Sequence, residues 1–144
     1  MMQPGRYTEL FFLDEATAMA AGHRPCAECR REDYDRFGEI WVERGLGAPG
    51  ADAIDVRLHE ERVDPATGGH RLHRQALRAL PDGAFVLHDD GPWLVLGDEL
   101  LGWTPGGYAE RRPRPGSHAA QVITPPSLIE ILRSRWDPVV ALVA

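Results

Sequence analysis

The chain contains no lysine, so all sixteen of its basic residues are arginine. A GC-rich genome is the simplest explanation, and selection of arginine for bidentate contacts with phosphate or carboxylate groups is the alternative. Acidic residues outnumber the arginines, which gives a formal net charge of −6. A negatively charged chain does not attract a phosphate backbone non-specifically, so the overall charge does not indicate a nucleic-acid partner.

Long apolar runs are also absent, and cysteine is scarce. No apolar run approaches the roughly 20 residues that a membrane-spanning helix needs, and the N-terminus lacks the pattern of a secretory signal. The apolar fraction of 43% and the charged fraction of 26% are typical of a soluble globular protein. We therefore predict a cytoplasmic protein without a membrane partner. In a reducing cytoplasm the two cysteines are expected to be thiols or thiolates rather than a disulfide.

Both cysteines lie in one motif, a CxxC pair formed by Cys26 and Cys29 directly after Pro25. This spacing can place two sulfurs on one metal ion, and thiolate ligands favour zinc. A redox CxxC normally follows a strand in a βαβ pattern, whereas the segment before this motif reads as a helix. Metal binding is therefore favoured, and two partly buried thiols without a ligand remain the alternative.

One CxxC supplies only half of a tetrahedral site, so histidines are the candidates to complete it. His70 and His73 form an HxxH motif at the start of a predicted helix, where both rings can point at one ion. His23, next to the CxxC turn, and His59 are the substitutes. For each histidine the alternative is an ordinary surface or hydrogen-bonded residue.

The first part of the chain reads as helical, and we assign residues 1–80 to a helical metal-binding half. Asp14 can cap the first helix, and apolar residues at helical spacing continue in three further segments. The expected helices cover residues 15–21, 25–43, 52–63 and 70–80. Both cysteines would then lie in the first turn of the second helix, where the helix dipole favours thiolate.

Residues 81–144 are expected to form a small antiparallel sheet with a C-terminal helix, packed as one unit with the first half. Strands are predicted at residues 84–88, 93–97, 100–104 and 120–124, the first two joined by a four-residue hairpin loop. Residues 109–118 read as a loop or an edge strand because of their prolines. Ser127 with Glu130 resembles a capping box that opens a final helix reaching about Trp136. The predicted fold class is thus α+β.

The same cysteines suggest a second chemistry. Zinc nucleobase deaminases combine a PCxxC with an HxE motif, in which histidine and two thiolates hold zinc and the glutamate transfers protons. Here PCAEC precedes His59 and Glu61, the reverse of the usual order, and the flanking βα pattern is absent. A deaminase-like or hydrolase-like enzyme that uses Cys26, Cys29, His59 and Glu61 is therefore an alternative.

Arg111, Arg112 and Arg114 lie close to Trp103 and Tyr108 in a proline- and glycine-rich stretch. Basic residues interleaved with aromatic ones suit stacking and phosphate contacts on single-stranded nucleic acid. A solvated, proline-stiffened loop is the simpler interpretation. No phosphate-binding glycine loop, serine triad or catalytic carboxylate pair is present.

The pattern FF-x-D-x-A-x-x-x-A-A-G-H-R-P-C-x-x-C, at residues 11–29, resembles the second half of the zinc module of Ada-type DNA alkylation-repair proteins. The resemblance implies that Cys26 and Cys29 are metal ligands and that Arg24 can face a phosphate. That module's first cysteine pair, with its methyl-accepting nucleophile, would lie N-terminal to this segment, and no other cysteine is present. Methyl transfer is therefore not carried over.

The chain as a whole also resembles a group of uncharacterised bacterial proteins with the same motif and a similar WTPGGY…TPPS tail, a likeness that implies no activity. The sequence thus predicts a structural zinc-type site and an association with nucleic acid through Arg24, Arg111, Arg112 and Arg114. Its metal ligands would be Cys26, Cys29, His70 and His73. We expect a non-enzymatic role, with a protein-interaction domain that has an incomplete metal site as a further alternative.

Overall fold

The computed structural model describes residues 14–25, 28, 30–88, 91–116, 118–134, 136 and 138. Within these residues the chain forms four α-helices and one six-stranded antiparallel sheet, which confirms the predicted α+β class. The helices are α1 (Glu15–Ala20), α2 (Arg31–Glu43), α3 (Ala51–Arg62) and α4 (Pro126–Arg133), with a 3-10 helix at Leu77–Ala79. The strands are β1 (His73–Ala76), β2 (Phe85–His88), β3 (Gly91–Leu96), β4 (Glu99–Thr104), β5 (Gly107–Pro113) and β6 (Ala119–Val122).

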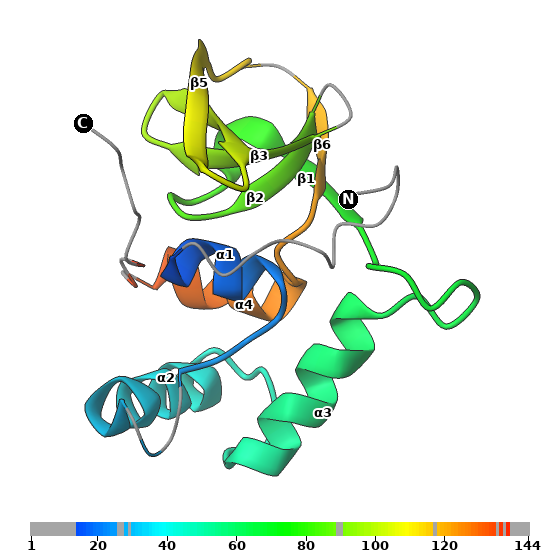
Figure 1. The fold of residues 1–144 in the computed structure, drawn as a ribbon. Coiled ribbons are helices and arrows are strands. Elements are labelled where there is room, and N and C mark those ends of the chain that lie inside the picture. Colours follow the sequence, from blue (N-terminus) through cyan, green and yellow to red (C-terminus); the bar gives the residue numbers. More distant parts are fainter. Residues whose placement is uncertain are drawn as a thin grey trace.

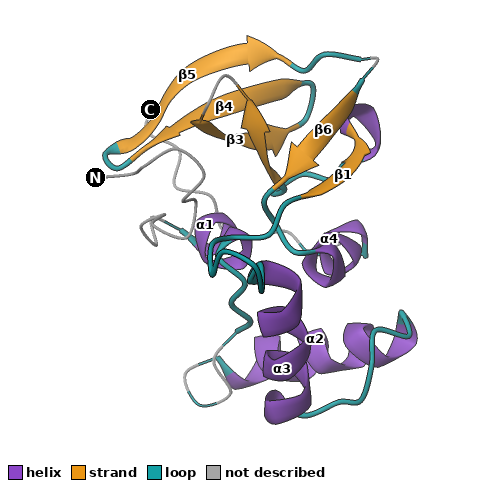
Figure 2. Ribbon diagram, turned by 90° about the vertical axis from the view of Figure 1, so that its right-hand side faces the viewer, coloured by secondary structure: helices purple, strands orange, loops and turns teal. Residues whose placement is uncertain are grey.

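The elements are stacked in layers, with the sheet at one end of the molecule (Figure 1). α1 and α4 lie against the sheet, and α2 and α3 lie beyond them, as the view turned by 90° also shows (Figure 2). The strand order is β1-β6-β2-β3-β4-β5, so consecutive hairpins build one side of the sheet and β6 inserts between β1 and β2. The segment that carries the cysteines joins α1 to α2 and therefore connects the middle layer to the outer helical layer.

The sheet is buried on both faces in its central strands. Four successive residues of β3 and four of β4 are buried, although neighbouring side chains on a strand point to opposite faces. Phe85 and Val86 of β2 accordingly belong to two different apolar clusters. The alanines Ala16 and Ala20 of α1 pack into the Phe85 cluster, because small side chains permit close approach of a helix to the sheet.

The larger apolar cluster extends from the sheet into the outer helices. It contains Phe37 and Trp41 of α2, whose rings stack with centroids 5.8 Å apart, and Trp136, whose ring meets Phe37 edge-on. Ile54 and Leu58 of α3 belong to the same cluster and are nearly inaccessible to solvent. This continuous core joins elements from both predicted halves of the chain.

Asp14 caps α1 as its sequence suggests. Its carboxylate accepts a hydrogen bond from the Thr17 N–H at 2.8 Å, and the Thr17 hydroxyl oxygen accepts one from the Asp14 N–H at 3.0 Å. The second oxygen of Asp14 accepts the Tyr108 hydroxyl at 2.8 Å. The predicted cap is therefore confirmed, and it also ties α1 to the edge strand β5.

The second helix begins later than predicted, at Arg31 rather than Pro25. Pro25, Glu28 and Arg30 are described and none of them is helical. The acidic residues Glu32 and Asp33 occupy the first turn of α2, where they interact favourably with the helix dipole. The prediction that the cysteines lie in the first turn of this helix falls on Cys26 and Cys29, which lie outside the described residues.

The helix predicted at residues 70–80 is wrong as well. His73–Ala76 forms strand β1, which pairs with β6 in the register His73↔Val122 to Ala76↔Ala119, and a 3-10 helix follows. Leu77 and Leu80, which contributed to the helical spacing, are the first residue and the C-cap of that short helix, and both are buried. Pairing with a strand distant in the sequence outweighed the local helical preference. β1 also places part of the predicted helical half within the sheet.

The C-terminal helix and the last edge strand differ in detail from expectation. α4 begins at Pro126 with Pro125 as its N-cap and ends at Arg133, so the predicted Ser127–Glu130 capping box is wrong. Residues 109–118 include most of β5, which lies at the edge of the sheet with Pro113 as its last residue. The edge-strand alternative for this stretch is confirmed. None of the helices in the described part of the chain is long and apolar enough to span a membrane.

Candidate metal centre

The segment between α1 and α2 is fixed at both of its ends by arginines. Before the cysteines, Arg24 forms a bidentate pair with Asp55 of α3, with Nε–Oδ1 at 2.9 Å and Nη2–Oδ2 at 3.1 Å. The same guanidinium donates to the Pro25 carbonyl and lies 5.3 Å from the Tyr34 ring centroid. Arg24 thus links the segment to α2 and α3 together.

After the cysteines, Arg30 makes the corresponding contacts with α1 and α2. Its Nη1 lies 2.8 Å from the nearly buried carboxylate of Glu15, and its Nε lies 2.8 Å from Asp33. Hydrogen bonds with both carboxylates help to raise the pKa of the Arg30 guanidinium against the opposing effect of its partial desolvation. Charge-assisted contacts of this kind are stronger and more directional than neutral ones. Arg24 and Arg30, which flank the cysteines, therefore contact three helices.

A hollow of about 430 Å³ lies beside the start of this segment, lined by Gly22, His23, Arg24, Asp55 and Arg62. The His23 side chain is exposed, yet desolvation by nearby atoms lowers its pKa, and the positive charges of Arg62 and Arg24 lower it further against the opposing effect of Asp55. The ring is consequently neutral near pH 7, which is the form that binds metal ions.

Gly22 permits the close approach of Arg62 to this hollow. Its φ is +90°, and a Cβ at this position would lie 2.5 Å from the Arg62 Cδ. The Arg62 guanidinium donates to the Ala21 carbonyl at the end of α1. The contact between α1 and α3 therefore depends on a residue without a side chain.

We expect Gly22→Ala to lower the free energy of unfolding by about 1 to 3 kcal/mol, through backbone strain and displacement of Arg62. Gly45→Ala is the matched control, since Gly45 has a φ of +67° but a Cβ added there would meet no atom within 4 Å. Urea unfolding of both variants separates the effect of backbone strain from that of displacing Arg62. Equal losses of unfolding free energy in the two variants would show that the Arg62 contact contributes nothing.

His70 and His73 reach the chain between β6 and α4 rather than an open surface. The His70 Nε2 lies 2.7 Å from the Ile123 carbonyl oxygen, and the His73 Nε2 lies 2.7 Å from that of Thr124. A carbonyl oxygen only accepts, so both Nε2 atoms carry the hydrogen and only the Nδ1 atoms retain lone pairs. The His70 Nδ1 is buried and has no hydrogen-bond partner among the residues that the structure describes. The structure thus brings these two histidines to adjacent carbonyls.

Because burial lowers the pKa of His70 from the ordinary value of 6.5, the protein is expected to lose stability in mild acid. The unfolded chain takes up a proton as the pH falls below 6.5, while the folded state resists protonation, so stability is retained above this pH and lost below it. Burial shifts the pKa of His73 in the same direction.

His70→Gln keeps a side-chain N–H donor but cannot titrate, so we expect it to flatten the dependence of unfolding free energy on pH below 6.5. Urea titrations at several pH values measure this slope. Replacement of the exposed His118 by glutamine is the control and is expected to leave the slope unchanged. Identical slopes for His70→Gln and the parent chain would show that His70 does not cause the loss of stability in mild acid.

Glu61, the general acid–base residue of the deaminase alternative, holds two helices together. Its Oε1 accepts the Ser127 backbone N–H at 2.9 Å and its Oε2 accepts the Ser127 hydroxyl at 2.6 Å, so it binds the first turn of α4. Arg57, one turn earlier on α3, also contacts Oε2 at 2.9 Å. His59 is exposed on the same helix. This full set of structural bonds disfavours a proton-transfer role for Glu61.

The predicted nucleic-acid-binding arginines of β5 and its neighbour are engaged within the chain. Arg111 pairs with Glu99, and Arg112 pairs with Glu110 while lying 4.9 Å from the Trp93 ring centroid. Arg114 donates to the carbonyls of Leu77, Leu80 and Gly97. Carboxylates neutralise the first two charges, and the third ties the 3-10 helix to the β3–β4 turn, so these arginines do not form one free basic patch.

No group of three or more His, Cys, Asp or Glu side chains suited to a metal ion occurs among the described residues. This finding concerns histidines and carboxylates, because Cys26 and Cys29 lie outside the described part of the chain.

Sequence reasoning missed the anchoring pairs of Arg30 with Glu15 and of Glu61 with Ser127. Their only sequence signal is an acidic residue among apolar helical positions, and this signal does not indicate which residue the carboxylate contacts.

Comparison of the chain with models of known families, with curated proteins and with solved structures gave no significant match.

Proposed function

We propose that this chain binds a zinc ion through the thiolates of Cys26 and Cys29, and that the ion has a structural role at the junction of α1, α2 and α3. Thiolate pairs at this spacing are typical of structural zinc sites. When bound, the ion would supply a cross-link between the two cysteines and further ligands. The resemblance of residues 11–29 to the Ada-type module supports the same proposal.

The observation that carries the proposal is the anchoring of both ends of the cysteine segment. Arg24 contacts Asp55 on one side and Arg30 contacts Glu15 and Asp33 on the other. Fixed ends reduce the conformational entropy that the segment would lose when its thiolates converge on an ion. An ordinary surface loop does not require charge-assisted contacts with three helices.

We propose His23 as a third ligand in preference to the HxxH pair. His23 precedes Cys26 by the same interval that separates Cys26 from Cys29, and its imidazole is neutral near pH 7 because desolvation and two arginines lower its pKa. His70 and His73 already use their Nε2 atoms on backbone carbonyls. Recruiting them would break buried hydrogen bonds or require their Nδ1 atoms.

Titration of the metal-free protein with cobalt(II) tests both the site and its ligands. Intense visible bands from thiolate–cobalt coordination are expected, with release of protons as the ligands bind. His23→Gln is expected to weaken cobalt binding at least about tenfold, whereas the His70→Gln/His73→Gln double variant is expected to bind like the parent chain. The reverse pattern would restore the HxxH pair as ligands, and an absence of thiolate bands would contradict the site itself.

A structural ion leaves no open coordination position for a substrate, so this proposal is of a non-enzymatic protein. The occupation of Glu61 by Ser127 and Arg57 supports that reading over a deaminase-like enzyme. A nucleic-acid partner stays a prediction. It rests on the Ada-type resemblance, and the ion pairs of Arg24, Arg111 and Arg112 do not favour it.

A further inference from the structure

The outer face of α2 carries two parallel rows of residues spaced by one helical turn. Tyr34, Gly38 and Val42 form an apolar row, and Asp35, Glu39 and Glu43 form an acidic row beside it. Together with Pro49 and Gly50, which precede and cap α3, these residues line a hollow of about 630 Å³. We call this feature the α2 groove.

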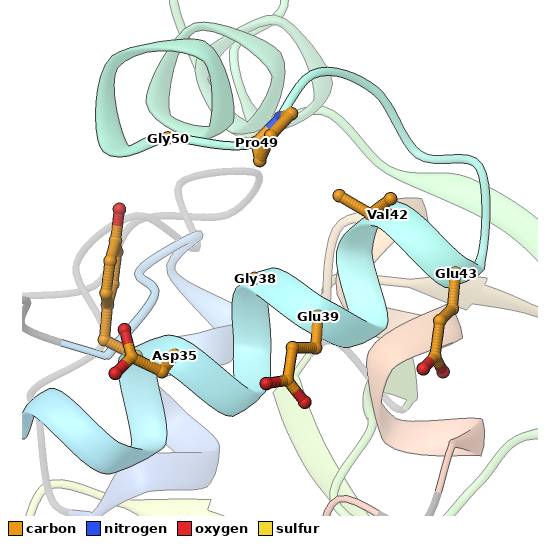
Figure 3. Close-up of a pocket in the computed structure, with 8 residues that line it drawn as sticks. Asp35, Gly38, Glu39, Val42, Glu43, Pro49 and Gly50 are labelled. Carbon is orange, nitrogen blue, oxygen red and sulfur yellow. The ribbon is translucent and has the colours of Figure 1, made fainter.

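The apolar row has a gap at its centre. Gly38 lies in the interior of a thirteen-residue helix, where glycine is less stable than alanine by about 1 kcal/mol. A Cβ at Gly38 would meet no atom of the described residues within 4 Å, so no contact with them requires glycine there. Val42 is 51% exposed, and Figure 3 shows it pointing across the open space toward Pro49.

The acidic row is also unfavourable for the isolated helix. Carboxylates at i and i+4 repel each other, and this row repeats that spacing twice. Asp35 pairs with Arg31, but no hydrogen bond or ion pair joins Glu39 or Glu43 to another described residue. Both residues line the groove, and Figure 3 shows their side chains extending along α2 on the side directed away from Pro49 and Gly50.

An interior glycine without a packing reason, an exposed valine and repeated like charges are three local costs on one helix face. Positions that break local rules without compensation inside the fold are expected where function requires them. A partner would relieve all three, because its side chain can enter above Gly38 and its cations can pair with the acidic row.

We propose that the α2 groove binds an amphipathic basic helix of another protein, with an apolar side chain over Gly38 and arginines or lysines one turn apart along Asp35, Glu39 and Glu43. Rows spaced by four residues on two helices interdigitate in the commonest helix packing. Within the described residues a second copy of this chain does not offer such a helix, since none of α1 to α4 has two arginines four residues apart. The proposal does not depend on the metal site.

The test uses the full chain and a fluorescein-labelled synthetic helix that has arginine at three positions spaced by four and leucine at the three adjacent positions. Fluorescence anisotropy is expected to show saturable binding that weakens as salt increases, because exposed ion pairs are screened. A scrambled peptide of the same composition is expected to bind at least about tenfold more weakly. Equal binding of both peptides, or no saturation up to about 1 mM, would overturn the proposal.

Gly38→Leu provides the sharpest variant because its two expected effects are opposite in sign. It should raise the melting temperature by about 2 to 4 °C, and it should weaken peptide binding at least about tenfold by filling the groove. Glu39→Gln should weaken binding and reduce its salt dependence, while Glu60→Gln, an exposed charge change on α3, should do neither. Unchanged binding by Gly38→Leu, or a change in oligomeric state without peptide binding, would overturn the proposal.

Discussion

The Cys26→Ser variant is expected to bind no zinc and to melt roughly 10 °C below the zinc-loaded parent chain. A ligand that binds only the folded state stabilises it by about 4 kcal/mol when its free concentration is a thousand times its Kd. Removal of one thiolate abolishes that contribution, because the remaining ligands cannot close a tetrahedral site. Differential scanning calorimetry with and without added zinc measures the loss.

Cys29→Ser is expected to have the same effect, and the double variant should be no worse than either single variant because both side chains act on one ion. A chelator should bring the parent chain to the melting temperature of the variants. The apo chain should still fold, since its apolar core extends from the sheet through α4 to α2 and α3. A parent chain whose melting ignores both zinc and chelator would contradict this prediction.

Glu61→Ala is expected to destabilise the fold by about 2 to 3 kcal/mol, which is more than the effect expected for Glu60→Ala. The Glu61 side chain is 12% exposed and accepts both the backbone N–H and the hydroxyl of Ser127. Its removal deprives α4 of a capping acceptor and leaves partly buried donors without a partner. Chemical unfolding monitored by tryptophan fluorescence measures the effect.

Two controls distinguish this structural role from a general effect of charge. Glu60→Ala removes the neighbouring exposed carboxylate and should change stability by less than about 0.5 kcal/mol. Ser127→Ala combined with Glu61→Ala should cost less than the sum of the single variants, since each removes the same hydrogen bond. If Glu61→Ala leaves the stability unchanged, or if the stability losses of Glu61→Ala and Ser127→Ala simply add in the double variant, the hydrogen bond between α3 and α4 does not have the predicted role.

Local sequence signals predicted those elements whose causes are themselves local. The capped first helix follows from Asp14 and the alanines after it, and the hairpin of β2 and β3 follows from apolar runs on either side of a polar turn. The helix prediction for residues 70–80 is wrong because the leucine spacing there fits both a helix and the strand with the 3-10 helix that forms. Pairing of this segment with β6, more than forty residues later in the register, decided the outcome.

The candidate site shows the same division. The CxxC motif and the neighbouring His23 are visible in the sequence, but the residues that anchor the segment are not. Asp55 meets Arg24 across 31 positions, and Glu61 meets Ser127 across 66. In the sequence both acids are ordinary helical carboxylates. The spacing of Ser127 and Glu130 suggests a local cap, whereas the Ser127 hydroxyl is bonded to α3.

The most direct test of the central claim is the zinc content of the purified full chain, measured by plasma emission spectrometry together with a count of reactive thiols. We predict about one zinc per chain and two protected thiols that become reactive when a chelator is added. Two reactive thiols and no zinc, in protein purified without chelator and then dialysed against zinc, would contradict the claim.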